Sequence, residues 1–413
     1  MNTLTGGKKA ILGFQHLLAM FGATVLVPIL TGMDTSVALL SAGLGTLIFH
    51  LVTGRKVPVF LGSSFAFIGA LAMTLSQYGI GAVKGGVIGA GLVYIIMAII
   101  IQLAGAEKVR SFFPPIVTGP VIIVIGLRLS PVALSMAGYS FDGATSMGHV
   151  DAESIIVASV VILTMVAISI FAKGFFKLVP ILISVIVGYV TAALMGMVDT
   201  TGIMDAAWLG MAGVSWETVT TLPEFNISAI TAIAPIAMVI FIEHFGDITT
   251  NGAVVGKDFF KDPGVHRTML GDGLATVIAG FLGGPANTTY SENTGVLAVT
   301  KVYDPSVLRL AAIFAVILSM IGKFGALINS IPTAVMGGVS IILFGMIASV
   351  GVRTMVEAQL DFAHSRNLII SSLILVTGIA IDNIFVWGTL SLSGLAIAAF
   401  LGIVLNKLLP SDI

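Results

Sequence analysis

The sequence from residue 283 to residue 301 reads Gly283-Gly-Pro-Ala-Asn-Thr-Thr-Tyr-Ser-Glu-Asn-Thr-Gly-Val-Leu-Ala-Val-Thr-Lys301. Its first half is rich in Gly, Pro and small polar residues, which do not hold a regular membrane-spanning helix, whereas the part after Glu292 is apolar and helical. The pattern predicts a helix that begins partway through a membrane. Such backbone is tolerated only where protein covers it or where it lines a cavity, and its unpaired N–H groups then point at whatever fills the cavity.

Glu292 lies at the start of this predicted half-helix. A carboxylate inside a membrane is a functional-site hypothesis by default, and the nearby Tyr290 offers a flat face for a ring. The plainer interpretation is a re-entrant loop in which Glu292 only caps a helix N-terminus. The rest of the chain favours a binding site.

The composition is that of a membrane protein. Of the 413 residues, 57% are hydrophobic and 9% are charged, and the mean hydropathy is +1.09. Soluble domains carry roughly 25% charged residues, so we expect an all-α polytopic protein embedded in a lipid bilayer. At about 20 residues per span, the length allows about fourteen segments and leaves no room for a sizeable soluble domain. The net charge of −1 gives no sign of nucleic-acid binding, and the absence of cysteine excludes disulfides and thiol-bound metals.

Hydropathy predicts two sets of seven spans, in each of which the third member is short. The first set covers residues 11–30, 35–53, 60–73, 86–103, 116–135, 153–171 and 178–197. The second set covers residues 227–248, 268–282, 291–300, 306–327, 333–349, 368–381 and 386–405.

Charge predicts the orientation of these spans. Most Lys and Arg residues fall in alternate loops or tails, so the positive-inside rule places both termini in the cytoplasm. The opposite side keeps little beyond Lys84, Arg128 and Lys323. The longest connection on that side, residues 199–226, carries Trp208 and Trp216 and is expected to form an interfacial lid or an amphipathic helix.

Two sets of seven spans have opposite orientations because seven is odd, which is typical of an inverted repeat. The third span of the first set begins Lys56-Val-Pro-Val-Phe-Leu-Gly-Ser-Ser-Phe-Ala-Phe67. Its short extended run breaks into a helix at residues 62–65, in the place that residues 287–293 occupy in the second set. We expect a crossed pair of half-helices, although Gly62-Ser-Ser is also compatible with a flexible, well-packed turn.

The eighth predicted span contains two further acids. Glu243 lies about 21 Å along a helix from the nearest cytoplasmic lysine, so it requires a partner or a cavity. Asp247 lies one turn nearer the cytoplasm on the same face. Together with Glu292 they form a predicted acidic cluster, which we expect to hold at least one proton at neutral pH. His244 points about 100° away and either titrates at the site or forms hydrogen bonds between helices.

These groups outline a ligand. The carboxylates accept hydrogen bonds, and the two helix starts, near Phe65 and Ser291, supply backbone N–H donors. Tyr290 and Phe65 add aromatic or apolar cover. Such a site suits a small, flat, neutral molecule that carries N–H donors and carbonyl acceptors. It suits a sugar less well and an anion poorly.

Three motifs resemble those of the nucleobase-ascorbate transporters, and in particular their uracil permease branch. They are Tyr290-Ser-Glu-Asn-Thr-Gly-Val-Leu-Ala-Val-Thr-Lys301, Gly62-Ser-Ser-Phe-Ala-Phe67 and Gln15-His-Leu-Leu-Ala-Met-Phe-Gly-Ala23. The resemblance extends over nearly the whole chain and implies fourteen segments in two inverted seven-segment repeats, with segments 3 and 10 each a short strand followed by a half-helix. It implies a core domain (residues 1–105 and 226–328) that moves against a gate domain (residues 106–225 and 329–413).

The resemblance also implies an activity. This is the proton-coupled import of uracil across the cytoplasmic membrane by alternating access, without a cofactor, a bound metal or catalytic residues. The gate segments offer a surface for homodimerisation. The implied substrate contacts are Ala23, Phe65, Glu243, Tyr290, Ser291 and Glu292, and the residues implied in proton coupling are Glu243, Asp247, His16 and Asn293.

Two positions depart from the family pattern. The best-known uracil permease pattern has His where this chain has Asp247 and Gly where it has Ser291, so the proton relay and the shape of the cavity are expected to differ. Asp247 either receives the proton as the ligand leaves or accepts a structural hydrogen bond from a Thr or an amide on a neighbouring helix.

Other functions are weighed on the same residues. Within transport, one alternative is a purine or xanthine carrier, although purine branches usually carry Gln at the position of Glu292. The other is coupling to Na⁺, bound by Asp247 and nearby carbonyls. An anion transporter of the related sulfate-transporter fold is disfavoured by the acids. An intramembrane aspartyl protease would use Asp272 and Asp304, but Asp272 lacks the Gly-x-Gly-Asp motif and Asp304 precedes a proline in a loop, so we expect no enzymatic activity.

Overall fold

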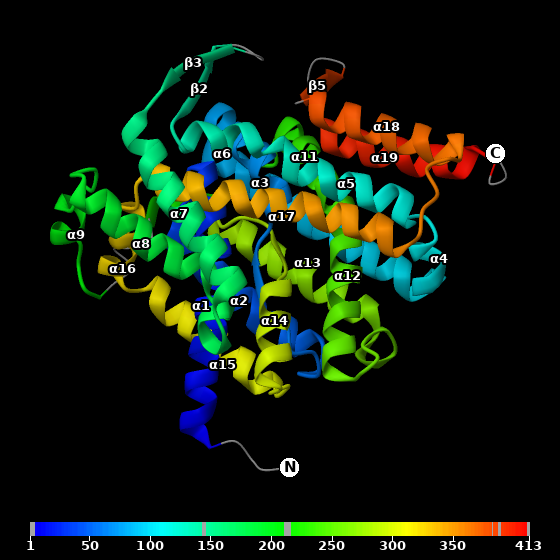
Figure 1. Cartoon of the computed structure of the whole chain (residues 1–413). Helices are drawn as coiled ribbons and strands as arrows, with labels where there is room; N and C mark the ends of the chain where they lie inside the picture. Colours follow the sequence, from blue (N-terminus) through cyan, green and yellow to red (C-terminus); the bar gives the residue numbers. More distant parts are fainter. Residues whose placement is uncertain (1–4, 143–145, 210–215, 382, 387–389, 411–413) are drawn as a thin grey trace.

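A computed structural model of the chain describes residues 5–142, 146–209, 216–381, 383–386 and 390–410. The protein is predominantly helical (Figure 1). The elements of the first half are α1 (Gly6–Thr31), α2 (Thr35–Val52), β1 (Leu61–Ser63), η1 (Phe65–Phe67), α3 (Ile68–Ala104), α4 (Ala106–Arg110), α5 (Pro115–Arg128), α6 (Ser130–Met136), β2 (Tyr139–Asp142), β3 (Ser146–Val150), α7 (Ala152–Phe171), η2 (Gly174–Leu178), α8 (Pro180–Leu194) and α9 (Thr201–Asp205).

The second half repeats this predominance of helices. Its elements are α10 (Trp216–Thr220), α11 (Ile227–Ile233), η3 (Ala234–Ile236), α12 (Ala237–Val255), η4 (Phe260–Gly264), α13 (Val265–Leu282), β4 (Asn287–Thr289), α14 (Ser291–Thr300), α15 (Pro305–Ser319), α16 (Gly322–Asn329), α17 (Thr333–Glu357), α18 (Ser365–Ala380), β5 (Asn383–Val386), β6 (Leu390–Ser393) and α19 (Gly394–Leu408).

A buried pair of short strands joins the two halves of the chain. Strands β1 and β4 pair antiparallel, with Leu61 opposite Thr289 and Ser63 opposite Asn287. Each strand is followed by a helix, β1 by η1 and α3, and β4 by α14. The pairing therefore brings two helix starts that are distant in sequence to the same place.

Side chains satisfy the backbone of these strands where the pairing does not. The N–H of Leu61 donates to Thr46 Oγ1 of α2 (2.9 Å), and His50 Nε2 lies 3.0 Å from the carbonyl oxygen of Val59. An unsatisfied backbone group surrounded by lipid or apolar protein costs several kcal/mol. The need to avoid this cost explains why the polar residues Thr46 and His50 of α2 are buried.

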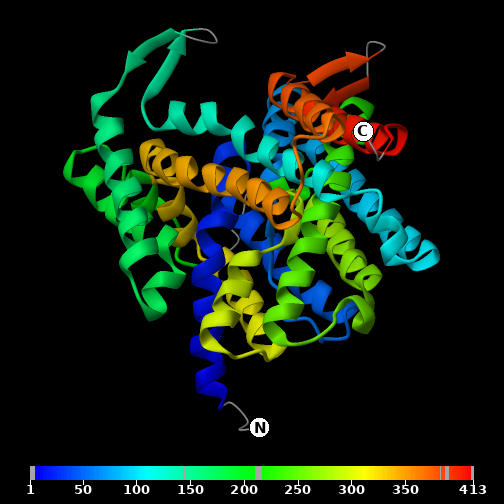
Figure 2. The ribbon, with the colours of Figure 1, turned by 45° about the vertical axis from the view of Figure 1, so that its right-hand side comes forward.

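The helices form two packed groups. In one group α2 packs on α13 and α15, α3 packs on α13, α1 packs on α15, and α12 packs on α14. In the other group α5 and α7 pack on α17, α8 packs on α7, and α18 packs on α5 and α19. Figures 1 and 2 show α17 running alongside α5. The candidate site described below lies between the two groups.

Glycine permits a close helix contact in the second group. A Cβ atom added at Gly119 of α5 would lie 3.0 Å from the carbonyl oxygen of Gly351 of α17, and one added at Gly351 would lie 2.5 Å from the carbonyl oxygen of Gly119. Small residues at helix interfaces allow backbones to approach in this way inside membranes. The α5–α17 pair therefore depends on both glycines.

The chain is a multi-pass membrane protein by the length and apolarity of its helices. Among the described residues, seven helices are long and apolar enough to cross a membrane, or eight if α15 and α16, which are bent by 84°, form one span. The third and fourth predicted spans are merged into α3, which breaks at Gly79, where φ is +79°. The fifth is divided at Leu129 into α5 and α6.

The prediction of a single span at residues 386–405 is wrong at its start. Residues 390–393 form β6, which pairs with β5, and α19 begins only at Gly394. The reason is local, because the Ser393 side chain accepts a hydrogen bond from the N–H of Ala396 (3.2 Å) and caps the helix there. Hydropathy alone does not separate an apolar hairpin from the end of an apolar helix.

The connection at residues 199–226 holds only the short helices α9 and α10 in its described parts, so the expected amphipathic helix is absent from residues 199–209 and 216–226.

Two lysines bind the backbone of this connection, one near each of its ends. Lys84 Nζ donates to the carbonyl oxygens of Val219 (3.0 Å) and Thr221 (2.6 Å). Lys323 Nζ likewise donates to the carbonyl oxygens of Ile203 (2.7 Å) and Met204 (2.8 Å) in α9. These bonds account for two of the three cations that depart from the charge pattern.

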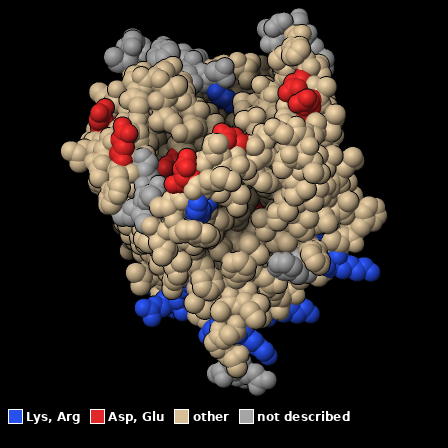
Figure 3. Space-filling model, turned by 90° about the vertical axis from the view of Figure 1, so that its left-hand side faces the viewer, with Lys and Arg blue, Asp and Glu red and all other residues tan. Residues whose placement is uncertain are grey.

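Charge is distributed unevenly over the surface. On the face shown in Figure 3, most of the visible Lys and Arg side chains lie toward the lower end, where Figure 1 places the N-terminus, and the visible Asp and Glu side chains lie higher. This distribution agrees with the loop charges on which the expected orientation rests. The orientation itself stays a prediction.

Candidate functional site

A cavity of about 380 Å³ lies between the two helix groups. Its volume is in the lower part of the range typical of small-molecule sites, about 300–1,000 Å³. One wall is formed by α12 and the starts of the two helices that follow β1 and β4, and the other by α5 and α17. The lining residues are Phe65, Ala66, Ile122, Ile125, Glu243, Asp247, Thr288, Thr289, Tyr290, Ser291, Glu292, Leu343, Met346, Ile347, Ser349, Val350 and Arg353.

The two helix starts supply hydrogen-bond donors to this cavity. Neither of the residues that precede them, Ser64 and Tyr290, caps its helix with a side-chain hydrogen bond. Their own N–H groups are used by the strand pair, since Ser64 N donates to the carbonyl oxygen of Ala286 (2.9 Å) and Tyr290 N to that of Phe60 (3.0 Å). The N–H groups of a first helical turn have no partner within the helix, and Phe65 and Ser291, which begin the two helices, line the cavity. Such N–H groups can donate to a carbonyl oxygen of a ligand.

Glu243 and Glu292 place carboxylates on two sides of the same cavity. Glu243 comes from α12 and Glu292 from the first turn of α14, two helices that pack on each other. The Glu243 side chain is exposed, but to the cavity inside a membrane-spanning segment. Among the ion pairs of the described residues, none joins Glu243, Asp247 or Glu292 to a Lys or Arg. Within the described part of the chain, these carboxylates are therefore acceptors without a cationic partner.

Asp247 is tied to the strand pair. Thr289 Oγ1 of β4 donates to Asp247 Oδ2 (3.0 Å). The structural hydrogen bond that we considered for this acid is thus present, although its donor lies on a strand and not on a helix. The bond uses one carboxylate oxygen, and Asp247 also lines the cavity. The geometry is therefore compatible with both alternatives.

Tyr290 is a fixed part of the cavity wall. Its side chain is buried, and its hydroxyl donates to the carbonyl oxygen of Ser63 (2.8 Å). The ring lies against Gly62, where an added Cβ atom would come within 2.4 Å of two ring carbons. Residue 62 must therefore be glycine for the Tyr290 ring to lie along β1. Tyr290 presents to a ligand only the part of its ring that β1 leaves uncovered.

Three of the predicted residues lie outside the cavity lining. Ala23 packs in an apolar cluster that includes Phe60 and Tyr290. Asn293 Nδ2 donates to the carbonyl oxygen of His16 (3.5 Å), so α14 and α1 meet at this point. His16 and Asn293 are both buried, and His16 Nδ1 and Asn293 Oδ1 have no hydrogen-bond partner in the described part of the chain. Their roles in coupling stay predictions.

His244 forms hydrogen bonds between helices, one of the two roles that we considered for it. Its Nδ1 lies 2.9 Å from Asp272 Oδ2 and its Nε2 lies 2.8 Å from Thr268 Oγ1, both on α13.

The two acids of the protease alternative are Asp272, which contacts His244, and Asp304. Asp304 caps α15 and pairs with Lys9 (2.7 Å). Both acids are thus engaged in contacts between or at the ends of helices.

Sequence reasoning missed the wall of the cavity opposite the acids. This wall comes from α5 and α17 and consists mainly of Ile, Leu, Met and Val side chains. Such residues carry no signal in an apolar sequence, because a helix that faces lipid has the same composition. Arg353 lies at one end of this wall. Thr288 and Thr289 could have been predicted as site residues, because they directly precede Tyr290 in the non-helical stretch.

The chain is similar to known permeases over nearly its whole length. The sequence model described as "Permease family" matches residues 7–386. A protein named "Probable uracil permease" from Haemophilus influenzae is 42% identical over 404 residues, which cover 98% of this chain and 94% of that protein. The proteins named "Uracil permease" from Bacillus subtilis and Escherichia coli are 43% and 41% identical and cover 96% of this chain, with 91% and 90% of their own lengths aligned.

Solved structures show the same fold at low sequence identity. The transmembrane domain of the cyanobacterial bicarbonate transporter BicA aligns with a TM-score of 0.64 at 14% identity, over 97% of this chain and 96% of that one. The anion transporter Slc26a9 of mouse, in an inward-facing state, aligns with a TM-score of 0.69 at 10% identity, over 97% of this chain and 67% of that one. At this identity the likeness concerns the fold alone. From the family match and the nearly full-length identity of more than 40%, the chain belongs to the nucleobase-ascorbate transporter family and is a membrane transporter, not an enzyme.

Proposed function

We propose that this protein is a uracil permease that imports uracil together with a proton, by alternating access, across the cytoplasmic membrane. The observation that carries the proposal is the cavity between the helix groups, into which two helix starts and the carboxylates of Glu243 and Glu292 point. Uracil is flat and neutral and has both ring N–H donors and carbonyl acceptors. Carboxylates match the N–H donors, and helix-start N–H groups match the carbonyls.

The relatives support the choice of uracil. The names of the aligned permeases refer to uracil in proteins from several bacteria, at 41–43% identity over nearly their whole length. Glu292 stands where purine-transporting branches of the family usually carry Gln, which favours a pyrimidine. The site also has three acids on its polar side, an arrangement that opposes the binding of an anion.

Proton coupling follows from the cost of charge inside a membrane. Glu243 and Glu292 face one cavity, and the described ion pairs give neither a cationic partner. Two such acids that are both ionised would repel each other in a poorly polarisable environment, so we expect a proton to reside on the pair. We assign the coupling proton to Glu243, with Asp247, His16 and Asn293 in supporting roles.

The fold supports alternating access. We assign the two packed groups to a core domain (residues 1–105 and 226–328) and a gate domain (residues 106–225 and 329–413), each drawn from both halves of a proposed set of fourteen segments in two inverted repeats. The polar groups of the site belong to the core, and the apolar wall of α5 and α17 belongs to the gate. A rigid core therefore carries its ligand past the gate, while both termini stay in the cytoplasm and the gate segments remain available for a homodimer.

The decisive experiment uses purified protein in liposomes without an inward Na⁺ gradient. We expect labelled uracil to accumulate when a proton gradient is imposed and to be lost when a protonophore is added. Empty liposomes and a Glu243→Gln variant serve as controls. Accumulation that requires Na⁺ and resists the protonophore would replace proton coupling by Na⁺ coupling. Uptake of labelled xanthine without uptake of labelled uracil would replace the substrate.

A further inference from the structure

A second large cavity, of about 430 Å³, lies apart from the candidate site. It is lined by Phe113, by Pro235 of η3, by Met238 of α12, by Leu392 of β6 and by residues of α19 between Ala396 and Ile403. We call it the apolar groove, because all of its lining residues have apolar side chains. None of them lines the site cavity. The groove therefore has no part in holding the ligand of the candidate site.

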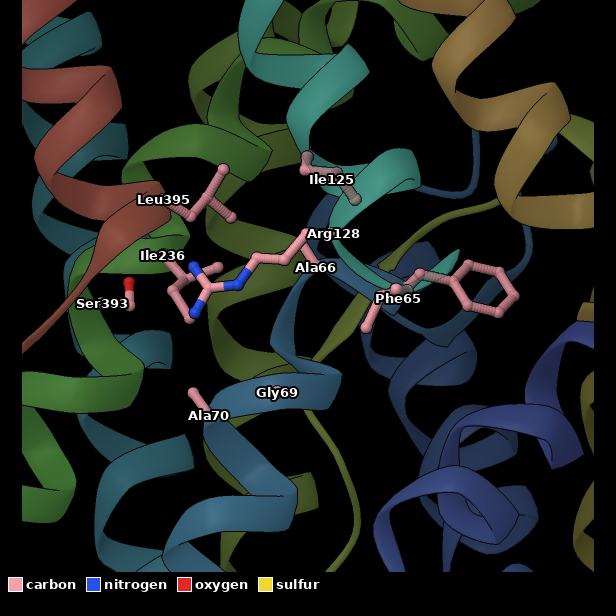
Figure 4. A pocket seen from close by; sticks show the side chains of 10 residues that line it. Phe65, Ala66, Gly69, Ala70, Ile125, Arg128, Ile236, Ser393 and Leu395 are labelled. Atoms are coloured by element: carbon pink, nitrogen blue, oxygen red, sulfur yellow. The ribbon is translucent and has the colours of Figure 1, made fainter. Parts of the chain in front are cut away.

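The apolar groove lies at the boundary between the two helix groups. Pro235 and Met238 belong to the group that contains α12, and the lining residues of α19 belong to the other group. Beside the groove the groups meet in a buried contact, where Ile236 of η3 and Leu395 of α19 line one small cavity (Figure 4). Each of these two residues adjoins a lining residue of the groove in sequence. The groove is therefore the outer edge of the contact between the groups.

The groove opens toward the lipid. Met238 is 40% exposed and Phe400 is 65% exposed, and they belong to a helix long enough to cross a membrane and to the apolar helix α19. Water does not fill a cavity that offers it no hydrogen-bond partners. An empty cavity, however, deprives the atoms of its walls of dispersion contacts. In a bilayer, a hydrocarbon chain fills such a groove and restores these contacts.

One end of the groove carries a lysine. The lining extends along α19 to Ile403, and Lys407 lies about one helical turn beyond it. Lys407 Nζ lies 4.4 Å from the centroid of the Phe112 ring, and the next residue, Phe113, lines the groove. The ammonium group is therefore held beside the end of the groove by an aromatic ring that it can contact through a cation–π interaction.

Two further cations lie close to this lysine in the chain that leads to Phe112. Lys108 and Arg110 are exposed residues of α4, which also carries one acid, Glu107. None of the ion pairs among the described residues uses Lys108, Arg110 or Lys407. This end of the groove therefore has an excess of positive charge. Basic residues of this kind attract the anionic headgroups of lipids at a membrane surface.

We propose that the apolar groove binds an anionic phospholipid, with one acyl chain between α12 and α19 and the phosphate group beside Lys407 and the cations of α4. Because both helix groups form the groove, motion between the groups changes its width. A flexible acyl chain keeps the apolar walls covered while the width changes, so the lipid facilitates this motion. The binding of the lipid does not depend on the proposed function, whereas its effect on transport rests on it.

The first test measures lipid binding without uracil. Delipidated protein in detergent is titrated with phosphatidylglycerol and, separately, with phosphatidylcholine that has the same acyl chains, and the bound lipid is counted by native mass spectrometry. We expect phosphatidylglycerol to bind about fivefold more tightly or better, because a single basic residue near an anionic headgroup already contributes roughly this factor. Equal affinities for the two lipids would overturn the assignment of an anionic lipid.

Two variants then locate the bound phosphatidylglycerol. Lys407→Gln should weaken its binding about fivefold, and Lys173→Gln, which changes an exposed lysine after α7, is the matched control. Ala396→Trp places a large side chain in the groove and should weaken binding about tenfold. Its control is Leu163→Trp, which changes an exposed residue of α7 outside the groove.

Equal losses in a variant and its control would place the lipid elsewhere and refute the proposal. A changed oligomeric state of Ala396→Trp with unchanged lipid binding would assign the groove to a second copy of the chain. If Ala396→Trp does not fold, Lys407→Gln and its control still decide the outcome, because Lys407 is exposed.

The second test measures the consequence for transport, in phosphatidylcholine liposomes with and without phosphatidylglycerol. We expect phosphatidylglycerol to accelerate uracil uptake by wild type and by Leu163→Trp but not by Ala396→Trp. Uracil binding should be the same in all three, because the groove and the site share no lining residue. Uptake by wild type at one rate in both kinds of liposome would refute the role of the lipid in transport. If wild type does not transport uracil at all, the proposed function fails, while the titrations still decide whether the groove binds the lipid.

Discussion

Replacing Gly62 by alanine tests whether the strand pair sets the shape of the site. The added Cβ atom would lie 2.4 Å from Cε2 and Cζ of Tyr290 and 2.8 Å from Thr24 Oγ1. An ordinary contact begins near 3.4 Å, so the ring has to retreat by about 1 Å. The ring is buried and its hydroxyl is bonded to Ser63, so the retreat removes that bond and pushes the ring toward the cavity.

The magnitude follows from these two consequences. Loss of the Tyr290–Ser63 hydrogen bond costs about 1 kcal/mol, and overpacking of a filled site costs typically 1–3 kcal/mol. The sum is about 2–4 kcal/mol. Since 1.4 kcal/mol corresponds to a tenfold change in an equilibrium constant, we expect uracil to bind at least tenfold more weakly to Gly62→Ala and the protein to unfold at a lower temperature.

The assay is equilibrium uracil binding to detergent-solubilised protein, combined with thermal unfolding of the same sample. Gly295→Ala is the matched control, because Gly295 lies on the half-helix α14 and an added Cβ atom there meets nothing within 4 Å. We expect this control to bind uracil like wild type. Wild-type affinity together with wild-type unfolding in Gly62→Ala would refute the view that the Tyr290 ring is held between β1 and the cavity.

The remaining predictions concern the acids. Glu243→Gln should abolish proton-driven accumulation more completely than Glu243→Asp, because an amide cannot carry the proton; near-normal accumulation by the Gln variant removes Glu243 from the coupling role. Glu292→Gln should weaken uracil binding by about 2 kcal/mol, the value of a charge-assisted hydrogen bond, and unchanged affinity in a binding titration would place the ligand elsewhere. If Asp247 relays the proton, Asp247→Asn should leave uracil binding intact and abolish accumulation. Thr289→Val should destabilise the protein by about 1 kcal/mol and leave proton coupling intact. Mild and equal losses of accumulation in both variants would assign Asp247 a structural role only.

The sequence located the polar half of the site because charge is conspicuous in an apolar chain. Glu243 and Asp247 fall on one helical face, and Glu292 follows a stretch that cannot span a membrane as a helix. Each of these signals is local, so it can be read without knowing the fold. The structure places all three residues in the lining of one cavity.

The apolar half of the site could not be predicted in this way. Leu343, Met346 and Ile347 of α17 look the same in sequence whether they face lipid, another helix or a ligand, since lipid is as apolar as a protein core. The contact between Gly62 and Tyr290 likewise depends on a strand pairing between distant parts of the chain. The wrongly predicted start of the last span has a related cause, because hydropathy reports apolar composition and not whether the backbone is paired as a strand or coiled as a helix.

The strand pair gives a physical reason why the site would move as one body under the proposed mechanism. Its register fixes β1 against β4, and Thr289 of β4 bonds to Asp247 of α12. The helix start at Phe65, the helix start at Ser291 and the acids of α12 are therefore linked by hydrogen bonds within a single packed group. The wall from α5 and α17 lines the cavity with mostly apolar side chains, and apolar surfaces can slide past each other without the loss of directional bonds. Motion between the groups then changes which end of the cavity is open, while the hydrogen-bonding groups around the ligand keep their mutual positions.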